Sequence, residues 1–182
     1  IDFGWDHPTA VVWIAWDRDT DTVYIYDCYA MRQETVPIHA SAINGRGKWI
    51  PVVWPMDGRQ ADKGSGKNLT DQYKKESVNM LRDHFSNPSS NGMKEGSGGN
   101  SVEAGIMEIL TRMQTKRLKI FKNQSKLLEE LRMYHRKDGK IVPAYDDVIS
   151  AMRYCVMSLR KARIKNYQPM QIQTDSEFNV FK

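Results

Sequence analysis

The sequence predicts an α/β fold in which helices flank a mixed β-sheet. Two observations favour this class. The first third of the chain is rich in β-branched and aromatic residues separated by short polar turns, as in consecutive strands. The rest alternates amphipathic helical patterns with short apolar runs, which is typical of a sheet with helices packed against it.

Three strands are expected at the start of the chain. Ile1–Gly4 is a short apolar segment, and Thr9–Trp16 is a dense run of β-branched and aromatic residues. Thr22–Tyr29 alternates between two kinds of side chain, as a half-buried strand does. The polar turn at residues 17–21 is short, so the strands are expected to form an antiparallel meander.

The middle of the chain then alternates helix and strand. A helix is expected over Val36–Asn44, because a proline occupies its first turn and glycines follow it. Trp49–Trp54 is apolar without alternation, which predicts a central strand buried on both faces. A short helix is expected at Thr70–Glu76. Residues 78–81 form either another strand or part of a helix that reaches residue 85.

The second half of the chain predicts three helices and one more strand. Ser101 is expected to cap a helix that runs to Thr115, with an apolar stripe made of Val102, Ile106, Ile109, Leu110 and Met113. The other elements are a strand at Leu118–Phe121 and helices over Ser125–Arg136 and 146–165. Residues 87–101 have the composition of a loop. One domain is therefore expected over residues 1–165, followed by a polar tail over 166–182.

The composition of the 182 residues excludes several classes of protein. No run approaches the ~18 consecutive apolar residues of a membrane-spanning helix. The N-terminal residues lack the basic and apolar regions of a signal peptide. Cys28 and Cys155 cannot form a disulfide framework and belong to no zinc pattern, so a reducing cytoplasm is expected.

Charge is distributed unevenly along the chain, although the net charge is only +5. Residues 1–60 hold five basic and eight acidic side chains, whereas residues 61–182 hold 22 basic and 14 acidic ones. This asymmetry favours a polyanionic partner held near a group of carboxylates. The alternative is a solvated basic surface with no partner.

Carboxylates occupy informative places in the expected fold. Asp2 lies on the first strand, Asp57 follows the apolar run 49–54, and Asp146 and Asp147 open the last helix. If the first and fourth strands are neighbours, these side chains converge at one edge of the sheet. Such a cluster suits Mg²⁺ or Mn²⁺, and two ions about 4 Å apart would support phosphoryl transfer. The alternative is structural, because Asp-Gly pairs form turns and acidic residues favour helix N-termini.

Basic side chains in the second half of the chain are candidate contacts to a nucleic-acid backbone. The segment 61–68 resembles a phosphate-binding loop, but it lacks the first glycine and the final Ser or Thr. A contact to DNA is therefore favoured over an ATP site. The candidate DNA-binding residues are Arg59, Lys63, Lys67, Arg117, Lys119 and Lys122.

Three groups of residues together resemble a known family. They are Asp2-Phe3-Gly4 followed by Asp6-His7-Pro8-Thr9-Ala10-Val11, then Asp57-Gly58, and finally Tyr145-Asp146-Asp147 with Ala151 and Tyr154. This combination resembles the nuclease domain of tailed-phage terminase large subunits, in particular the headful-packaging terminases of short-tailed phages. The resemblance covers roughly residues 1–160.

The resemblance implies an RNase H-like fold of the retroviral-integrase superfamily and a metal-dependent endonuclease that cuts concatemeric double-stranded DNA when packaging starts and ends. It implies that Asp2, Asp57 and Asp147 are catalytic and bind two Mg²⁺ or Mn²⁺ ions, with Asp146 as a further ligand. Where the family often shows another acidic residue this chain has Ser150, which gives Asp146 more weight.

The resemblance also implies partners. The family places an ATPase domain before the nuclease domain, so the chain is expected to be the C-terminal part of a longer protein. The small terminase subunit, the portal and double-stranded DNA are the implied partners, in the cytoplasm of the infected host cell and with no membrane. Alternatives with the same fold are a junction resolvase, a strand-transfer core or an RNase H. A non-catalytic module that docks on DNA or a portal is a further alternative.

Overall fold

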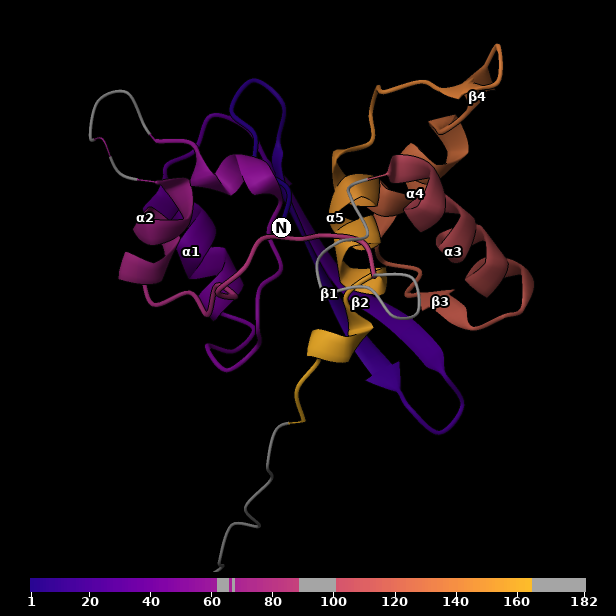
Figure 1. Ribbon diagram of the computed structural model, residues 1–182, viewed down its shortest axis with the longest axis horizontal. Helices are drawn as coiled ribbons and strands as arrows, with labels where there is room; N and C mark the ends of the chain where they lie inside the picture. Colours follow the sequence, from indigo (N-terminus) through magenta and orange to yellow (C-terminus); the bar gives the residue numbers. More distant parts are fainter. Residues whose placement is uncertain (62–65, 67, 89–100, 165–182) are drawn as a thin grey trace, which may run out of the picture.

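The computed structural model describes residues 1–61, 66, 68–88 and 101–164 (Figure 1). Its central sheet has the order β1-β2-β3, with β1 at Thr9–Asp17, β2 at Thr22–Met31 and β3 at Leu118–Ile120. The strands β1 and β2 are antiparallel, and β3 joins β2 in parallel through the pairs from Val23–Leu118 to Ile25–Ile120. The expected strands at 9–16, 22–29 and 118–121 are thereby confirmed, and the sheet is mixed.

Three further segments follow one another outward from β1 but form only single bridges. Asp2 pairs with Ala10 through two backbone hydrogen bonds of 2.8 and 2.9 Å, and the Ile1 nitrogen donates to the Val53 carbonyl at 2.9 Å. Val52 in turn pairs in parallel with Met80. The first and fourth expected strands are therefore neighbours, as the convergence of the carboxylates requires.

The expectation of a regular strand at Trp49–Trp54 is wrong. Only Val52 has a bridge partner, and Trp49 is 42% exposed, so the segment is not buried on both faces. Pro51 and Pro55 remove two backbone donors, which limits the ladder. The segment from Val78 to Leu81 likewise contributes one bridge, and the alternative of a helix to residue 85 is wrong.

The expected helices are present in the expected order: the first has the expected bounds, the second is shifted by one residue, and the last three are shorter. The helices and short turns are α1 (Val36–Asn44), the 3-10 turn η1 (Met56–Arg59), α2 (Leu69–Lys75), α3 (Val102–Gln114), α4 (Ser125–Met133), α5 (Asp147–Val156) and the 3-10 turn η2 (Leu159–Lys161). Ser101 occupies the N-cap position of α3 but makes no side-chain capping bond. The expected stripe of α3 is wrong at Val102 and Leu110, which are 42% and 43% exposed. The last helix ends at Val156, well before the expected residue 165.

A small hairpin replaces the expected end of the helix at 125–136. The strands β4 (Arg136–Lys137) and β5 (Lys140–Ile141) pair antiparallel around Asp138 and Gly139. Both turn residues have positive φ, 51° and 75°, which is the backbone that a two-residue hairpin turn requires. Asp-Gly is a frequent sequence for that turn, so the residues that end the expected helix also carry the signal of a hairpin.

Two hydrophobic cores lie on opposite faces of the sheet. Successive side chains of β1 point to opposite faces, so they belong alternately to the two cores. Ala10 and Val12 belong to the core under α5, together with Leu127 and Met152. Val11 and Trp13 point the other way, into a core with residues of α1 and α2. Figure 1 shows α1 and α2 on one side of β1 and β2, with α3, α4 and α5 on the other. In the described part of the chain no helix is long and apolar enough to cross a membrane.

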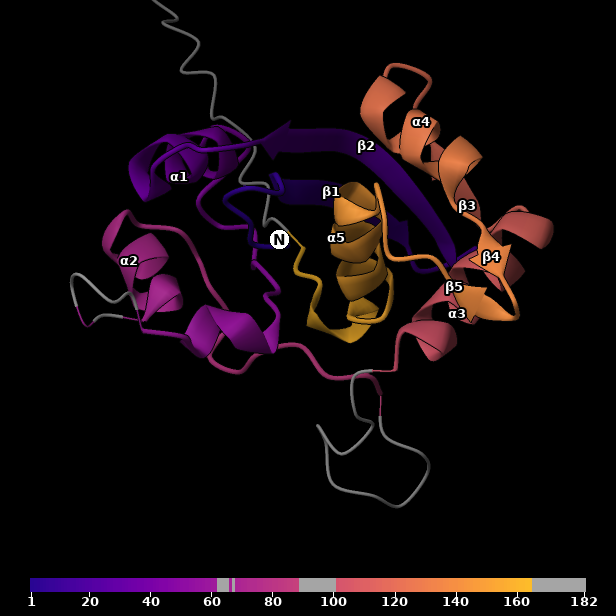
Figure 2. The ribbon, with the colours of Figure 1, turned by 90° about the horizontal axis from the view of Figure 1, so that it is seen from above.

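The expected loop at 87–101 lies mostly outside the described residues, as does the expected tail at 166–182. Figure 2 shows α5 lying directly against β1, so the start of this helix is brought to the same part of the molecule as the N-terminal segment. The packing of α5 on the sheet is therefore what joins residues from the two ends of the chain.

Candidate active site

Asp2, Asp57 and Asp147 come together although they are far apart in the sequence. Asp2 is half-buried beside β1, Asp57 lies in η1, and Asp147 is the first residue of α5. The pKa of Asp2 is raised to about 7, chiefly because its carboxyl is buried and further because Asp57 and Asp147 are negative neighbours. Asp57 and Asp147 thus both act electrostatically on Asp2.

The position of Asp57 depends on the glycine that follows it. A Cβ at Gly58 would lie 2.7 Å from Phe3 Cε2 and 2.8 Å from Trp54 Cε3, so only glycine allows this turn to pack so closely. The Gly58 carbonyl accepts a hydrogen bond of 3.1 Å from the Thr70 hydroxyl. Asp57 itself reaches solvent, and partial burial of its carboxyl raises its pKa. The Asp57-Gly58 turn is therefore packed against the segment that carries Asp2.

The start of α5 is held by a residue from another helix. Asp146 is the N-cap residue of α5, yet its side chain makes no capping hydrogen bond. Instead, Glu130 Oε2 on α4 accepts from the backbone nitrogens of Val148 at 2.9 Å and Ile149 at 3.1 Å. Burial, followed by the charge of Asp147, raises the pKa of Asp146. Asp146 and Asp147 are thus both free of capping bonds at the helix start.

Arg153 supplies positive charge close to these carboxylates. It is 5% exposed, and its guanidinium lies 4.6 Å from the ring centre of Tyr154 and 5.3 Å from that of Phe85. Its charge acts on both Asp2 and Asp146. The Tyr154 hydroxyl contacts the Asp2 carboxylate, and burial first of all raises the pKa of that tyrosine. Arg153 is therefore one of several positive neighbours, since the N-terminal ammonium also lowers the pKa of Asp2 and His7 also acts on Asp146.

The carboxylates do not form a compact single-ion site. Among the described residues, no three His, Cys, Asp or Glu side chains converge closely enough to hold one metal ion. The donors are nevertheless hard oxygen atoms, and their mutual repulsion has only partial compensation from Arg153. Asp57 also lines a cavity of about 510 Å³, shared with Phe3, Gly4 and Gln60, so its surroundings are open.

The six candidate DNA-binding residues lie in different surroundings. Arg59 ends η1 and is exposed, and Lys122 is exposed after β3. Lys119 lies over the ring of Tyr24, with its Nζ 5.5 Å from the ring centre. Arg117 is bound to Asp21 Oδ2 at 2.5 Å. Lys63 and Lys67 lie outside the described residues.

The sequence reasoning missed Glu130 and Arg153, although both carry a signal. Glu130 is in helical phase with Leu127, Leu131 and Tyr134, so a charged residue interrupts an apolar stripe. Arg153 follows Ile149 by four residues, about one helical turn, and is buried with it. A charge on the buried face of a helix requires a specific partner, and that requirement could have identified both residues.

Comparison with known proteins places this chain in a family. Residues 1–159 match the family of the terminase RNaseH-like domain. The chain is 40% identical over 164 residues to the large terminase subunit of Salmonella phage P22, and 40% identical over 157 residues to that of Enterobacteria phage LP7. These matches cover 90% and 86% of this chain but 31% of each relative, so the chain spans about a third of their length.

Solved structures agree with this assignment. The P22 large terminase nuclease domain superposes with a TM-score of 0.77 at 40% identity, covering 89% of this chain and 80% of that one. The large terminase of the thermophilic bacteriophage D6E superposes at 0.62 with 14% identity, covering 87% and 38%, and shows the fold alone. The expected RNase H-like fold is confirmed, and the chain belongs to the terminase RNaseH-like domain family.

Proposed function

We propose that this chain is the nuclease domain of a phage terminase large subunit and that it cuts double-stranded DNA at the start and end of genome packaging. The observation that carries the proposal is the meeting of Asp2, Asp57 and Asp147 at the start of α5, with the pKa of Asp2 raised to about 7 by burial and by these neighbours. Family membership and the likeness to the P22 large terminase nuclease domain support it.

Two divalent ions, Mg²⁺ or Mn²⁺, are the proposed cofactors. Mg²⁺ commonly binds through one or two carboxylates and completes its octahedral shell with water and substrate phosphate oxygens. Pairs of carboxylates therefore suffice, and the Asp2, Asp57, Asp146 and Asp147 side chains supply oxygen donors of the right kind. When bound, such ions would generate a hydroxide nucleophile and stabilise the attacking and leaving oxygens.

The surrounding residues have separate proposed roles. Asp2 is the central ligand, because its carboxyl interacts with both Asp57 and Asp147. Asp147 is the main ligand from α5, whereas Asp146 interacts chiefly with Asp147 and also with His7 and Arg153. Arg153 offsets part of the negative charge, and the Tyr154 hydroxyl orients the Asp2 carboxylate.

The exposed basic residues hold the DNA backbone in this proposal. Arg59, Lys119 and Lys122 present their charge at the surface, and Lys63 and Lys67 belong to the same proposed set. Arg117 would contact DNA only while it keeps or exchanges its bond to Asp21. Contacts to phosphates position DNA without reading its bases, so cleavage should show little sequence preference.

The whole protein would contain more than this domain. We propose an N-terminal ATPase domain, because the chain covers only 31% of its P22 relative and because a D6E large terminase was solved in complex with ADP. The small terminase subunit and the portal are the further proposed partners, and the host cytoplasm is the proposed location. A chain with this domain alone would cut DNA without translocating it.

The test is cleavage of supercoiled plasmid by the wild-type chain and by Asp57→Asn. Each is incubated in EDTA, in Mg²⁺ and in Mn²⁺, and nicked and linear products are resolved on a gel. We expect wild type to cut only with metal and Asp57→Asn to be inactive while still binding DNA. The control is Asp71→Asn, which changes an exposed aspartate of α2 that pairs with Lys74.

Two outcomes would contradict the proposal. Full metal-dependent nicking by Asp57→Asn would remove this residue from the site. Binding of DNA without cleavage in any divalent ion would favour a docking module. Including a four-way junction and an RNA–DNA hybrid beside the plasmid shows whether a resolvase or an RNase H describes the activity better.

A further inference from the structure

We propose that Glu130 is a positioning residue for the active site: by capping α5 from the neighbouring helix α4, it leaves Asp146 and Asp147 free to bind metal. This inference rests on the proposed function. It assigns a role to a fully buried acid that neither the motif nor the catalytic set includes.

The capping geometry is the first step of the argument. The first N–H groups of a helix lack acceptors within the helix, and the side chain of the N-cap residue usually accepts from the second or third of them. In α5 the N-cap residue is Asp146, so these groups belong to Val148 and Ile149. Both donate to Glu130 Oε2 instead, at 2.9 and 3.1 Å. Glu130 thus occupies the role that the Asp146 side chain would otherwise have.

The second step is the effect on the two aspartates. A carboxylate that caps its own helix is turned toward the backbone, and its charge is partly offset by the N–H groups. Because Glu130 accepts these bonds, the Asp146 side chain makes no capping contact. Asp147 follows at the first helical position, and both residues are half-buried rather than enclosed. Glu130 therefore fixes the start of α5, and the Asp146 and Asp147 carboxylates are left available to bind a ligand.

The third step is the rigidity of the cap. Glu130 and its neighbour Leu127 are 0% exposed, so the packing of α4 against the core holds the carboxylate in place. The second oxygen, Oε1, has no hydrogen-bond partner among the described residues, and Lys126 Nζ lies 4.0 Å away. Burying a carboxyl group with one unpaired oxygen costs folding free energy. The two hydrogen bonds that Oε2 accepts offset part of this cost.

Four variants test this role: Glu130→Ala, Glu130→Gln, Glu130→Asp and the control Glu129→Ala on the exposed face of α4. The readout is the Mn²⁺ concentration that gives half-maximal plasmid cleavage, measured beside the thermal midpoint in EDTA. Loss of an outer-shell partner typically costs about 10–100-fold in metal affinity. We expect a rise of that size for Glu130→Ala, a smaller rise for Glu130→Asp and no change for Glu129→Ala.

The glutamine variant distinguishes positioning from charge. Its amide oxygen can still accept from Val148 and Ile149, so the Mn²⁺ requirement should stay within about threefold of wild type, even where the thermal midpoint changes. Aspartate keeps the charge but is one methylene too short to reach both nitrogens. If Glu130→Ala does not fold, the comparison of glutamine with aspartate decides the question.

The proposal is overturned if Glu130→Ala lowers the thermal midpoint while its Mn²⁺ requirement equals that of wild type. It is also overturned if glutamine raises the requirement as much as alanine does. Amide hydrogen exchange of Val148 and Ile149, followed by NMR without metal, keeps this test separate from the proposed nuclease activity. Loss of protection in Glu130→Ala but not in Glu129→Ala would support the cap even if wild type failed to cut DNA.

Discussion

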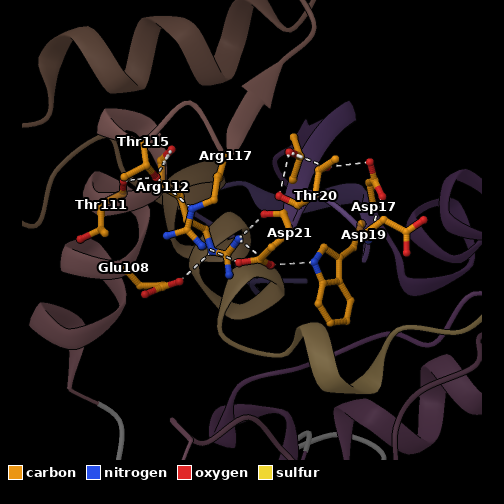
Figure 3. A network of polar contacts seen from close by, with 11 residues as sticks. Asp17, Asp19, Thr20, Asp21, Glu108, Thr111, Arg112, Thr115 and Arg117 are labelled. Atoms are coloured by element: carbon orange, nitrogen blue, oxygen red, sulfur yellow. Dashed lines mark hydrogen bonds and ion pairs between the residues drawn. The ribbon is translucent and has the colours of Figure 1, made fainter.

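Two groups of acidic side chains in this domain differ in how their charge is balanced. Asp21, in the turn between β1 and β2, is bound by Arg112 at 3.2 Å, by Arg117 at 2.5 Å and by the indole of Trp16 at 2.9 Å (Figure 3). Burial alone would raise its pKa, but the hydrogen bonds and the arginine charges lower it. In the group around Asp2, burial and negative neighbours instead raise the pKa of Asp2 to about 7.

The difference separates a structural network from a candidate ligand site. Arg112 is 7% exposed, and it also binds Glu108 and the Asp21 carbonyl, so it ties α3 to the β1–β2 turn. Each charge of that network has a partner within the protein. The carboxylates around Asp2 have Arg153, the N-terminal ammonium and His7 as positive neighbours, and the proposed metal ions would balance the rest of their charge. Replacing an aspartate by asparagine should therefore have different effects on the free energy of unfolding in the two groups: no loss at Asp2 and a loss at Asp21.

The largest expected effect comes from Asp2→Asn. Metal-dependent cleavage should fall by more than about 100-fold, because even residues beyond the ligands contribute about 10–100-fold. Its free energy of unfolding in EDTA should not fall, since a repelled buried charge is removed. Asp21→Asn should lower the free energy of unfolding and leave cleavage unchanged. Urea unfolding measures the free energy and plasmid cleavage measures the activity of both variants. A lower unfolding free energy for Asp2→Asn would contradict the proposed difference between the two groups.

A smaller effect is expected from Arg112→Ala. The variant loses hydrogen bonds to Glu108 and to the Asp21 carbonyl and leaves a gap under α3, which should cost about 2–3 kcal/mol of unfolding free energy. DNA affinity, measured by fluorescence anisotropy, should stay the same. Arg132→Ala, on the exposed side of α4, is the control and should stay within about 0.5 kcal/mol. Weaker DNA binding without lost stability would show that Arg112 contacts phosphate.

The smallest of the three effects is a pH dependence in EDTA. In the unfolded chain Asp2 loses its proton near its ordinary pKa, whereas the folded domain keeps it until about pH 7. The stability that this proton provides is full below about pH 4 and is lost as the pH rises to about 7. Because Asp2 is partly exposed, its share should be about 2 kcal/mol, less than the full shift would give.

Urea unfolding between pH 4.5 and 8 measures this slope, and Asp2→Asn should flatten it. Glu130, whose pKa burial also raises to about 7, contributes in the same direction, so a residual slope is expected in the variant. Saturating Mn²⁺ at pH 8 should restore the lost stability of wild type by binding the folded state. An Asp2→Asn slope as steep as that of wild type would assign the effect to other groups.

The sequence predicted the elements better than the side-chain partners. Asp2 could be singled out as a carboxylate on a short apolar strand, and Asp57 and Asp147 because they stand at the ends of expected elements; the fold then brings them together. Glu130 could not be linked to α5 from local patterns, because its bonds to residues 148 and 149 depend on how α4 packs. Arg117, predicted to contact DNA, is instead bound to Asp21, a partner that also depends on how the elements pack.

The distance along the chain between the site residues has a consequence for synthesis and folding. The proposed ligands lie at positions 2, 57, 146 and 147, and the sheet under α5 includes the parallel pairing of Val23 with Leu118, which are also far apart in the sequence. Contacts of such large sequence separation form slowly, because long loops must close first. A nascent or truncated chain that lacks α5 therefore lacks part of the proposed site, and the proposed nuclease would not cut DNA until the last helix has docked.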